Sequence, residues 1–194
     1  MTLPTYHSLR RLIGRAKTYL QDREGSAALE FGLLAIPFFT LIFGILELAI
    51  ILFVNANMTH AVSEAGRQIR IGNFQACGGD PAEKFKELVC ENMSFFGSCT
   101  DRLRVDVKTG PNFHTIVLPD PPEADDTDSA VPNGTVANTV GGDPVVARAI
   151  YYYSLALPAA LTRLETQKGS GIRELVSSTA FRNEPFSAPG NCPK

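Results

Sequence analysis

The feature that most constrains this chain is an apolar run of 24 residues from Phe31 to Val54, in which Glu47 is the one charged side chain. About 20 apolar residues, each rising 1.5 Å along a helix, cross the hydrocarbon core of a bilayer. The run therefore predicts a single membrane-spanning helix. The alternative is a cleaved secretory signal, because Val54-Asn55-Ala56 is similar to a small-residue cleavage site. Signal cores hold only about 7–15 apolar residues, which favours the membrane helix.

The charges on the two sides of this run differ in sign. Residues 1–25 carry five basic and two acidic side chains, whereas residues 55–194 carry thirteen basic and sixteen acidic ones. Basic flanks of a span stay on the cytoplasmic side. We therefore expect a single-pass protein with a cytoplasmic N-terminus and an external C-terminal part. The overall charge of −2 favours no particular partner, and we expect no nucleic acid.

Helical spacing continues beyond the apolar run to about Ile71, where Gly72-Asn73 can end a helix. This predicts three parts. Residues 1–25 are a basic cytoplasmic leader, residues 26–72 are the transmembrane and extended helix, and residues 73–194 are an extracytoplasmic domain.

The domain after the helix has the local patterns of an α+β fold with an antiparallel sheet. Helical spacing predicts a helix over Glu83–Glu91, with Asp80 as its cap and Pro81 near its start, and a short helix over Ala159–Glu165. Alternation and β-branched or aromatic residues predict four strands, at Leu103–Lys108, Phe113–Leu118, Val145–Leu155 and Glu174–Phe181.

The four cysteines, Cys77, Cys90, Cys99 and Cys192, all follow the apolar run. This placement fits an oxidising exterior, where disulfides persist. Four cysteines allow three pairings. We predict Cys90–Cys99, because that loop is short and easily closed, with Cys77–Cys192 tying the ends of the domain. A zinc site is not favoured, because the chain has no Cys-x-x-Cys pair and no His beside a cysteine.

Residues 23–31, Arg-Glu-Gly-Ser-Ala-Ala-Leu-Glu-Phe, lead directly into the apolar run in the manner of a type IV pilin precursor. Cleavage after Gly25 would make Ser26 a new amino terminus, with Glu30 four residues later on the same helix face. A cation at Ser26 and an anion at Glu30 could then pair at the lipid margin, within one chain or between neighbours.

Glu47 is the second acid in the membrane segment, seven residues before Val54 and therefore roughly 10 Å deep. An acid within a membrane favours a functional contact, with another subunit or with an assembly protein. The alternative is a carboxyl group that is protonated or that reaches the outer interface.

The sequence shows no motif that carries chemistry. It has no HExxH, P-loop, GxGxxG or nucleophile-elbow pattern, and its three histidines are far apart. Five acids within residues 119–128 could suit calcium, but the spacing does not match an EF-hand and a solvated loop is the simpler interpretation. We expect a non-enzyme without catalytic residues, cofactor or metal.

Several segments together resemble the TadE-like proteins, minor pilin-like (pseudopilin) components of the tight adherence (Flp-type) pilus system of bacteria. The segments are Gly25–Phe31, Phe43–Glu47, Ala61–Arg67, Val89-Cys90, Cys99, Leu103–Val107 and Phe181–Phe186. The resemblance is spread over most of the chain and is thin across residues 109–144.

The resemblance implies a function and partners. It implies cleavage by a prepilin peptidase between Gly25 and Ser26, Glu30 at the fifth mature position, and a bacterial inner-membrane protein with a periplasmic domain. It also implies contacts with other pilin-like subunits and pilus assembly proteins, and a role in pilus biogenesis, surface adhesion and biofilm formation. Major pilins of this system are very short, so the large outer domain indicates a minor component. The alternative is a membrane-anchored periplasmic binding or sensor module with an uncleaved N-terminus.

Overall fold

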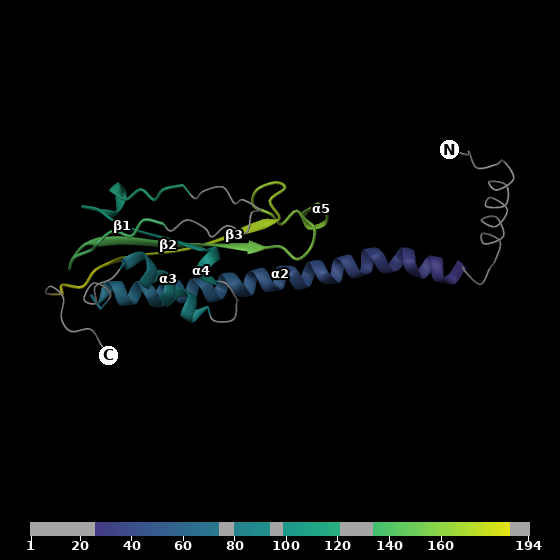
Figure 1. Ribbon diagram of the computed structural model, residues 1–194, viewed down its shortest axis with the longest axis horizontal. Helices are drawn as coiled ribbons and strands as arrows, with labels where there is room; N and C mark the ends of the chain where they lie inside the picture. Colours follow the sequence, from purple (N-terminus) through teal and green to yellow (C-terminus); the bar gives the residue numbers. More distant parts are fainter. Residues whose placement is uncertain (1–25, 74–79, 94–98, 121–133, 187–194) are drawn as a thin grey trace, which may run out of the picture. The chain divides into compact units, whose positions relative to one another are not determined.

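The computed structural model describes residues 26–73, 80–93, 99–120 and 134–186 (Figure 1). The chain divides into two compact units, residues 1–46 and 47–194, and the division falls within the first described helix, α2 (Ser26–Arg70). A three-stranded antiparallel sheet and short helices follow. The predicted fold class, a long N-terminal helix followed by an α+β domain with an antiparallel sheet, is confirmed. The predicted domain boundaries after residues 25 and 72 remain predictions.

Helix α2 is 45 residues long and contains Pro37. Its end agrees with the prediction, because Gly72 follows with a backbone φ of 81°. This left-handed conformation is one that glycine adopts without steric cost. A side chain here would also meet the ring of Phe186, which lies 2.6 Å from the position of a Cβ atom.

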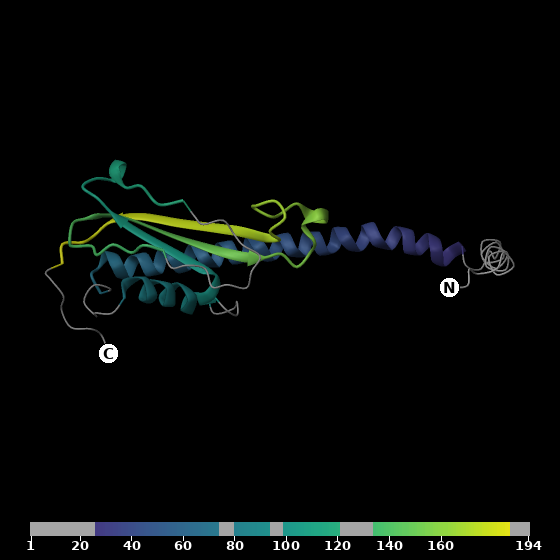
Figure 2. The same cartoon turned by 45° about the horizontal axis from the view of Figure 1, so that its top comes forward.

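The sheet has the strand order β1 (Leu103–Thr109), β2 (Pro144–Ser154) and β3 (Ile172–Arg182), with β2 in the centre (Figure 2). Both pairings are antiparallel. Three of the four predicted strands are therefore confirmed, each within two residues at either end. Their β-branched and aromatic side chains alternate between a buried face and a second face, as the sequence pattern indicates.

Two short helices precede β1. Helix α3 (Pro81–Asn92) begins where Asp80 and Pro81 predict, and the Asp80 side chain accepts a 2.9 Å hydrogen bond from the backbone N–H of Ala82. Helix α4 (Cys99–Arg102) was not predicted. A disulfide between Cys90 and Cys99 joins the two helices.

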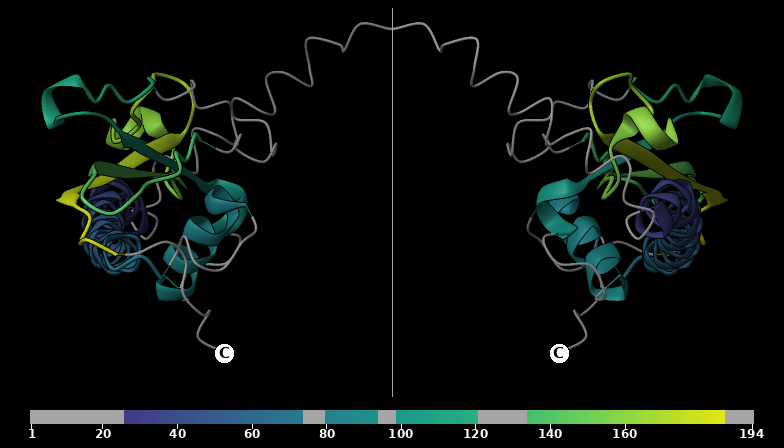
Figure 3. Two further views of the ribbon diagram at one scale, coloured as in Figure 1. Left: turned by 90° about the vertical axis from the view of Figure 1, so that its left-hand side faces the viewer. Right: turned by 90° about the vertical axis from the view of Figure 1, so that its right-hand side faces the viewer.

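The core of the second unit lies between the sheet and two helices. The second half of α2 and one side of α3 pack on the same face of the sheet (Figure 3). The largest fully buried side chains come from all of these elements and include Met58, Ile69, Phe85, Leu103 and Val145. The part of α2 from Glu47 onward is thus held by the domain that follows it.

The prediction of a strand over Phe113–Leu118 is wrong. The structure has instead the 3-10 turn η3 (Phe113–Thr115), in which the Asn112 side chain accepts a hydrogen bond from the backbone N–H of Thr115. Phe113 and Val117 are exposed. The alternation is present, but the side chains have no surface against which to bury, and the capping Asn favours a turn.

The prediction of a helix over Ala159–Glu165 is confirmed only for its first half. Helix α5 (Ala159–Thr162) ends before Arg163, whose φ is 51°. A residue in this left-handed conformation cannot continue a right-handed helix.

Candidate functional site

The predicted processing site lies at the start of α2. Gly25 is outside the described residues, and Ser26 is the first residue of the helix. Ser26 and Glu30 are both exposed, and their spacing places them on one face of the helix. Their roles in processing and assembly stay predictions.

The apolar side chains of α2 that follow are exposed. Leu33, Leu34, Ile36, Phe38 and Leu41 are each more than half accessible. A surface of this kind on a helix long and apolar enough to span a bilayer identifies a candidate membrane span.

Glu47 is the most unusual residue of the second half of this span. Its side chain is only 3% exposed. The backbone N–H of Ala156 donates to its Oε1 atom, and the backbone nitrogen of Leu157 lies 3.3 Å from both carboxylate oxygens. Both donors belong to the loop that joins β2 to β3. We call this arrangement the Glu47 clamp.

The clamp explains how an acid can occupy the apolar run. An unpaired charge inside a membrane costs roughly 2.5–3.5 kcal/mol on insertion scales. Hydrogen bonds from two backbone amides to a carboxylate are charge-assisted, and they satisfy the amides as well. The structure therefore gives Glu47 a partner within the chain, and the predicted contact with another subunit or assembly protein stays a prediction.

Beyond the apolar run, α2 approaches β3 closely at Gly66. A Cβ atom there would lie 3.0 Å from Cγ2 of Thr179 and 3.1 Å from Cε1 of Phe181. Gly66 is therefore explained by close packing of the helix on the sheet, which offsets the roughly 1 kcal/mol that Gly costs in a helix relative to Ala.

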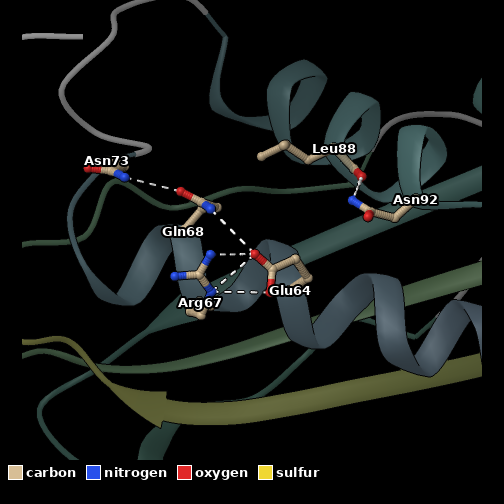
Figure 4. A network of polar contacts seen from close by, with 6 residues as sticks. All are labelled: Glu64, Arg67, Gln68, Asn73, Leu88 and Asn92. Atoms are coloured by element: carbon tan, nitrogen blue, oxygen red, sulfur yellow. Dashed lines mark hydrogen bonds and ion pairs between the residues drawn. The ribbon is translucent and has the colours of Figure 1, made fainter. Parts of the chain in front are cut away.

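The end of α2 carries an exposed polar network, shown in Figure 4. The guanidinium of Arg67 donates to both carboxylate oxygens of Glu64, with the shortest contact at 2.6 Å. This hydrogen bonding lowers the pKa of Glu64. Gln68 donates to Glu64 and accepts a hydrogen bond from Asn73. Exposed pairs of this kind contribute little stability, so we assign the network to the helix end rather than to a binding site.

A second buried acid, Asp106, lies on the sheet face that points away from α2. Its carboxylate accepts hydrogen bonds from Arg104, from Arg148 and from the backbone N–H of Thr135. Burial alone would raise the pKa of Asp106, but the hydrogen bonds, led by that of Arg148, outweigh it and lower the pKa. Arg148 also donates to the carbonyl oxygen of Pro119. The cluster binds the sheet to the segments that cross it.

Sequence reasoning missed this cluster. Asp106 alternates with Val105 and Val107 in β1, which predicts an exposed position. It is buried because residues 134–137 cross over it, where Val136 forms a parallel bridge with Val107. Arg148 faces Asp106 directly in the register of β1 and β2, and that pairing is the signal that could have found the cluster.

The predicted disulfide between Cys90 and Cys99 is confirmed. Cys77 and Cys192 lie outside the described residues, as does the acidic stretch from residue 121 onward. Within the described part of the chain, no three His, Cys, Asp or Glu side chains are grouped so that they could hold a metal ion.

The described residues thus form a long apolar helix, a candidate membrane span, followed by a small α+β unit. The family model that matches this chain is described as TadE-like protein, and it covers residues 25–67. This stretch begins at Gly25, contains Ser26, Glu30 and Glu47, and ends at Arg67. The predicted resemblance to the TadE-like proteins is confirmed over these residues. Comparison with the curated proteins gives no match, and comparison with the solved structures gives none.

The match covers the long helix α2, which is the part of the chain that is similar to TadE-like proteins. By its length and composition, α2 makes the chain a candidate for anchoring in a membrane.

Proposed function

We propose that this protein is a minor pilin-like component of a tight adherence pilus system, cleaved by a prepilin peptidase between Gly25 and Ser26. The observation that carries the proposal is the family match over residues 25–67, which coincides with the exposed apolar helix and begins at the proposed cleavage site. Cleavage would place a free ammonium group at the first residue of α2.

The arrangement of the first helical turn supports a role in assembly. The new amino terminus would lie one turn before Glu30 on the same helix face. Both groups would lie at the lipid margin, where an unpaired charge is costly. Pairing within the chain or with a neighbouring subunit removes that cost, so the carboxylate at Glu30 favours close packing of membrane helices. We infer contacts with other pilin-like subunits and assembly proteins, and through them a role in pilus biogenesis, surface adhesion and biofilm formation.

The proposed location follows from the charge distribution. The basic leader would stay in the cytoplasm, where the peptidase acts, and residues 73–194 would lie in the periplasm of a bacterium. The disulfide between Cys90 and Cys99 supports an oxidising compartment for the domain. The domain is far larger than a major pilin of this system needs, which supports a minor or priming role.

The test of processing uses two glycines of the same region. Gly25→Leu, expressed beside the peptidase, should leave a full-length band on a gel, whereas wild type gives the shorter form. Gly32→Leu is the matched control, because Gly32 is exposed and a Cβ atom there meets nothing within 4 Å. A wild-type chain that stays full length would reject processing and favour the anchored binding or sensor module.

The test of assembly uses Glu30→Ala. This variant should be cleaved normally but should fail to recover partner pilins in a pull-down, because the ammonium group of Ser26 would lose its counter-charge. Normal recovery of the partners would show that Glu30 has no part in assembly.

A further inference from the structure

The loop that joins β2 to β3 begins with an apolar stretch, residues 155–164, of sequence Leu-Ala-Leu-Pro-Ala-Ala-Leu-Thr-Arg-Leu. Its only charged residue is Arg163. Leu155 and Leu164 pack against the core, whereas Leu161 points outward and is 60% exposed. This stretch, which we call the apolar loop, contains α5 and lies at the end of the sheet where the Glu47 clamp holds it (Figure 1).

The clamp fixes the level of the apolar loop along α2. Glu47 lies seven residues before the end of the apolar run, which is about 10 Å along the helix axis. Its neighbours on the helix, including Leu48, Ile50 and Leu52, are apolar and exposed. The loop is therefore attached at the same level as side chains that face lipid, if α2 spans a membrane.

The backbone at the start of the loop is suited to a place without water. The N–H of Leu155 donates to the carbonyl of Gly171, and the amides of Ala156 and Leu157 donate to Glu47. Pro158 has no N–H, and its carbonyl accepts a hydrogen bond from Leu161. Irregular backbone can enter the membrane region only when its polar groups are satisfied, and these amides meet that condition.

We propose that the apolar loop inserts into the bilayer surface on the side of the folded domain, with Leu161 among the lipid chains and the Glu47 clamp holding the loop at that depth. Arg163 and Lys168 are exposed in the same connection between β2 and β3. Basic side chains at such a position reach the lipid headgroups while their stems stay apolar. The domain would then have two attachments to the membrane, α2 and the loop, which fix its orientation on the surface. The proposal rests on α2 spanning a membrane, as in the proposed function.

The test uses tryptophan fluorescence, because the chain contains no tryptophan. The full-length chain with Leu161→Trp is placed in nanodiscs, one chain per disc, made of phosphatidylcholine and phosphatidylglycerol with or without bromine on the acyl chains. We expect brominated lipid to reduce the emission about twofold or more, as for an apolar side chain buried among acyl chains. Val140→Trp is the matched control, because Val140 is 64% exposed and lies just before β2, at the opposite end of the strand. Its emission should not change.

A third variant separates this proposal from the membrane anchoring on which it rests. Leu34 is 63% exposed within the apolar run, so Leu34→Trp should be quenched if α2 spans the bilayer. Quenching of Leu34→Trp without quenching of Leu161→Trp would overturn the loop proposal alone. Absence of quenching in both Leu34→Trp and Leu161→Trp would also overturn the membrane anchoring by α2. The emission of Leu161→Trp could also be shifted to the blue and yet be insensitive to bromine. Protein rather than lipid would then cover the loop, and the loop proposal would be overturned.

The clamp is tested in the same background. Adding Glu47→Ala to Leu161→Trp removes the acceptor for both amides, and we expect quenching to fall to the level of Val140→Trp. Adding Glu47→Gln keeps a side chain of the same shape with one acceptor oxygen, and should retain part of the quenching. Full quenching in the Glu47→Ala variant would show that Glu47 does not hold the loop. Cooperative unfolding of each variant, followed by circular dichroism, confirms that the domain is folded.

Discussion

At the scale of single residues, two buried acids are stabilised in different ways. Glu47 accepts hydrogen bonds from backbone amides 109 and 110 residues further along the chain. Asp106 is held between two arginines and one amide. Each carboxylate joins segments that are distant in sequence, so a single substitution at either position is expected to loosen a long-range contact of the fold.

Asp106→Asn should lower the free energy of unfolding by about 3 kcal/mol, because it removes the carboxylate charge that Arg104 and Arg148 both contact at a largely buried place. The pKa of Asp106 is lowered in the folded protein, so its contribution to stability is present above the ordinary value of 3.8 and is lost as the pH falls below it. Wild type should therefore lose stability in acid more steeply than Asp106→Asn.

The measurement is denaturant unfolding of the full chain in detergent micelles at several pH values. The exposed Asp120→Asn is the control and should leave the stability nearly unchanged. Parallel pH profiles for wild type and Asp106→Asn would contradict the role given to Asp106.

At the scale of elements, the close approach of α2 to β3 makes Gly66 sensitive to size. Gly66→Val should lower the free energy of unfolding by about 1–3 kcal/mol, because its side chain would overlap Thr179 and Phe181. Ser63→Val places the same side chain at an exposed position on the same helix and should cost much less. Equal unfolding midpoints for the two variants would show that the helix and strand are not in close contact at this point.

The disulfide joins α3 to α4 across a sequence separation of 9 residues. Replacing both cysteines, as Cys90→Ser with Cys99→Ser, should lower the free energy of unfolding by about 2–3 kcal/mol, because the unfolded chain regains the entropy of an open loop. Urea unfolding of oxidised wild type, reduced wild type and the double variant measures this. Reduction should lower the stability of wild type at least to that of the double variant, because it also opens the predicted Cys77–Cys192 bridge. A double variant as stable as oxidised wild type would contradict the expectation.

The same elements show what the sequence could and could not predict. The long helix, the start of α3 and all three strands follow from local periodicity and capping residues, which act over a few positions. The alternation at Phe113–Leu118 has the same local form but forms a turn, because a strand also needs a partner and a surface to cover. The burial of Asp106 depends on a crossing segment about thirty residues away.

The candidate site was predicted in part for the same reason. An acid inside an apolar run is visible in the sequence, so Glu47 could be named. Its partners could not, because they are backbone amides, which carry no side-chain signature, and they lie in a loop more than a hundred residues further on.

At the scale of the whole molecule, the two parts of α2 lie in different surroundings. Its first part is covered with exposed apolar side chains, and its second part contributes a face of the domain core. The family match covers this helix and little else of the chain, over residues 25–67. We therefore predict that the part of the chain similar to TadE-like proteins is the part that is processed and inserted into the membrane.

The most direct test is the intact mass of the chain extracted from membranes of cells that also express its own prepilin peptidase, with sequencing of its N-terminus. We expect a chain that begins at Ser26, lacks the first 25 residues and retains the disulfide between Cys90 and Cys99. Recovery of the chain with its N-terminus intact at Met1, from cells in which the peptidase is active on another substrate, would contradict it.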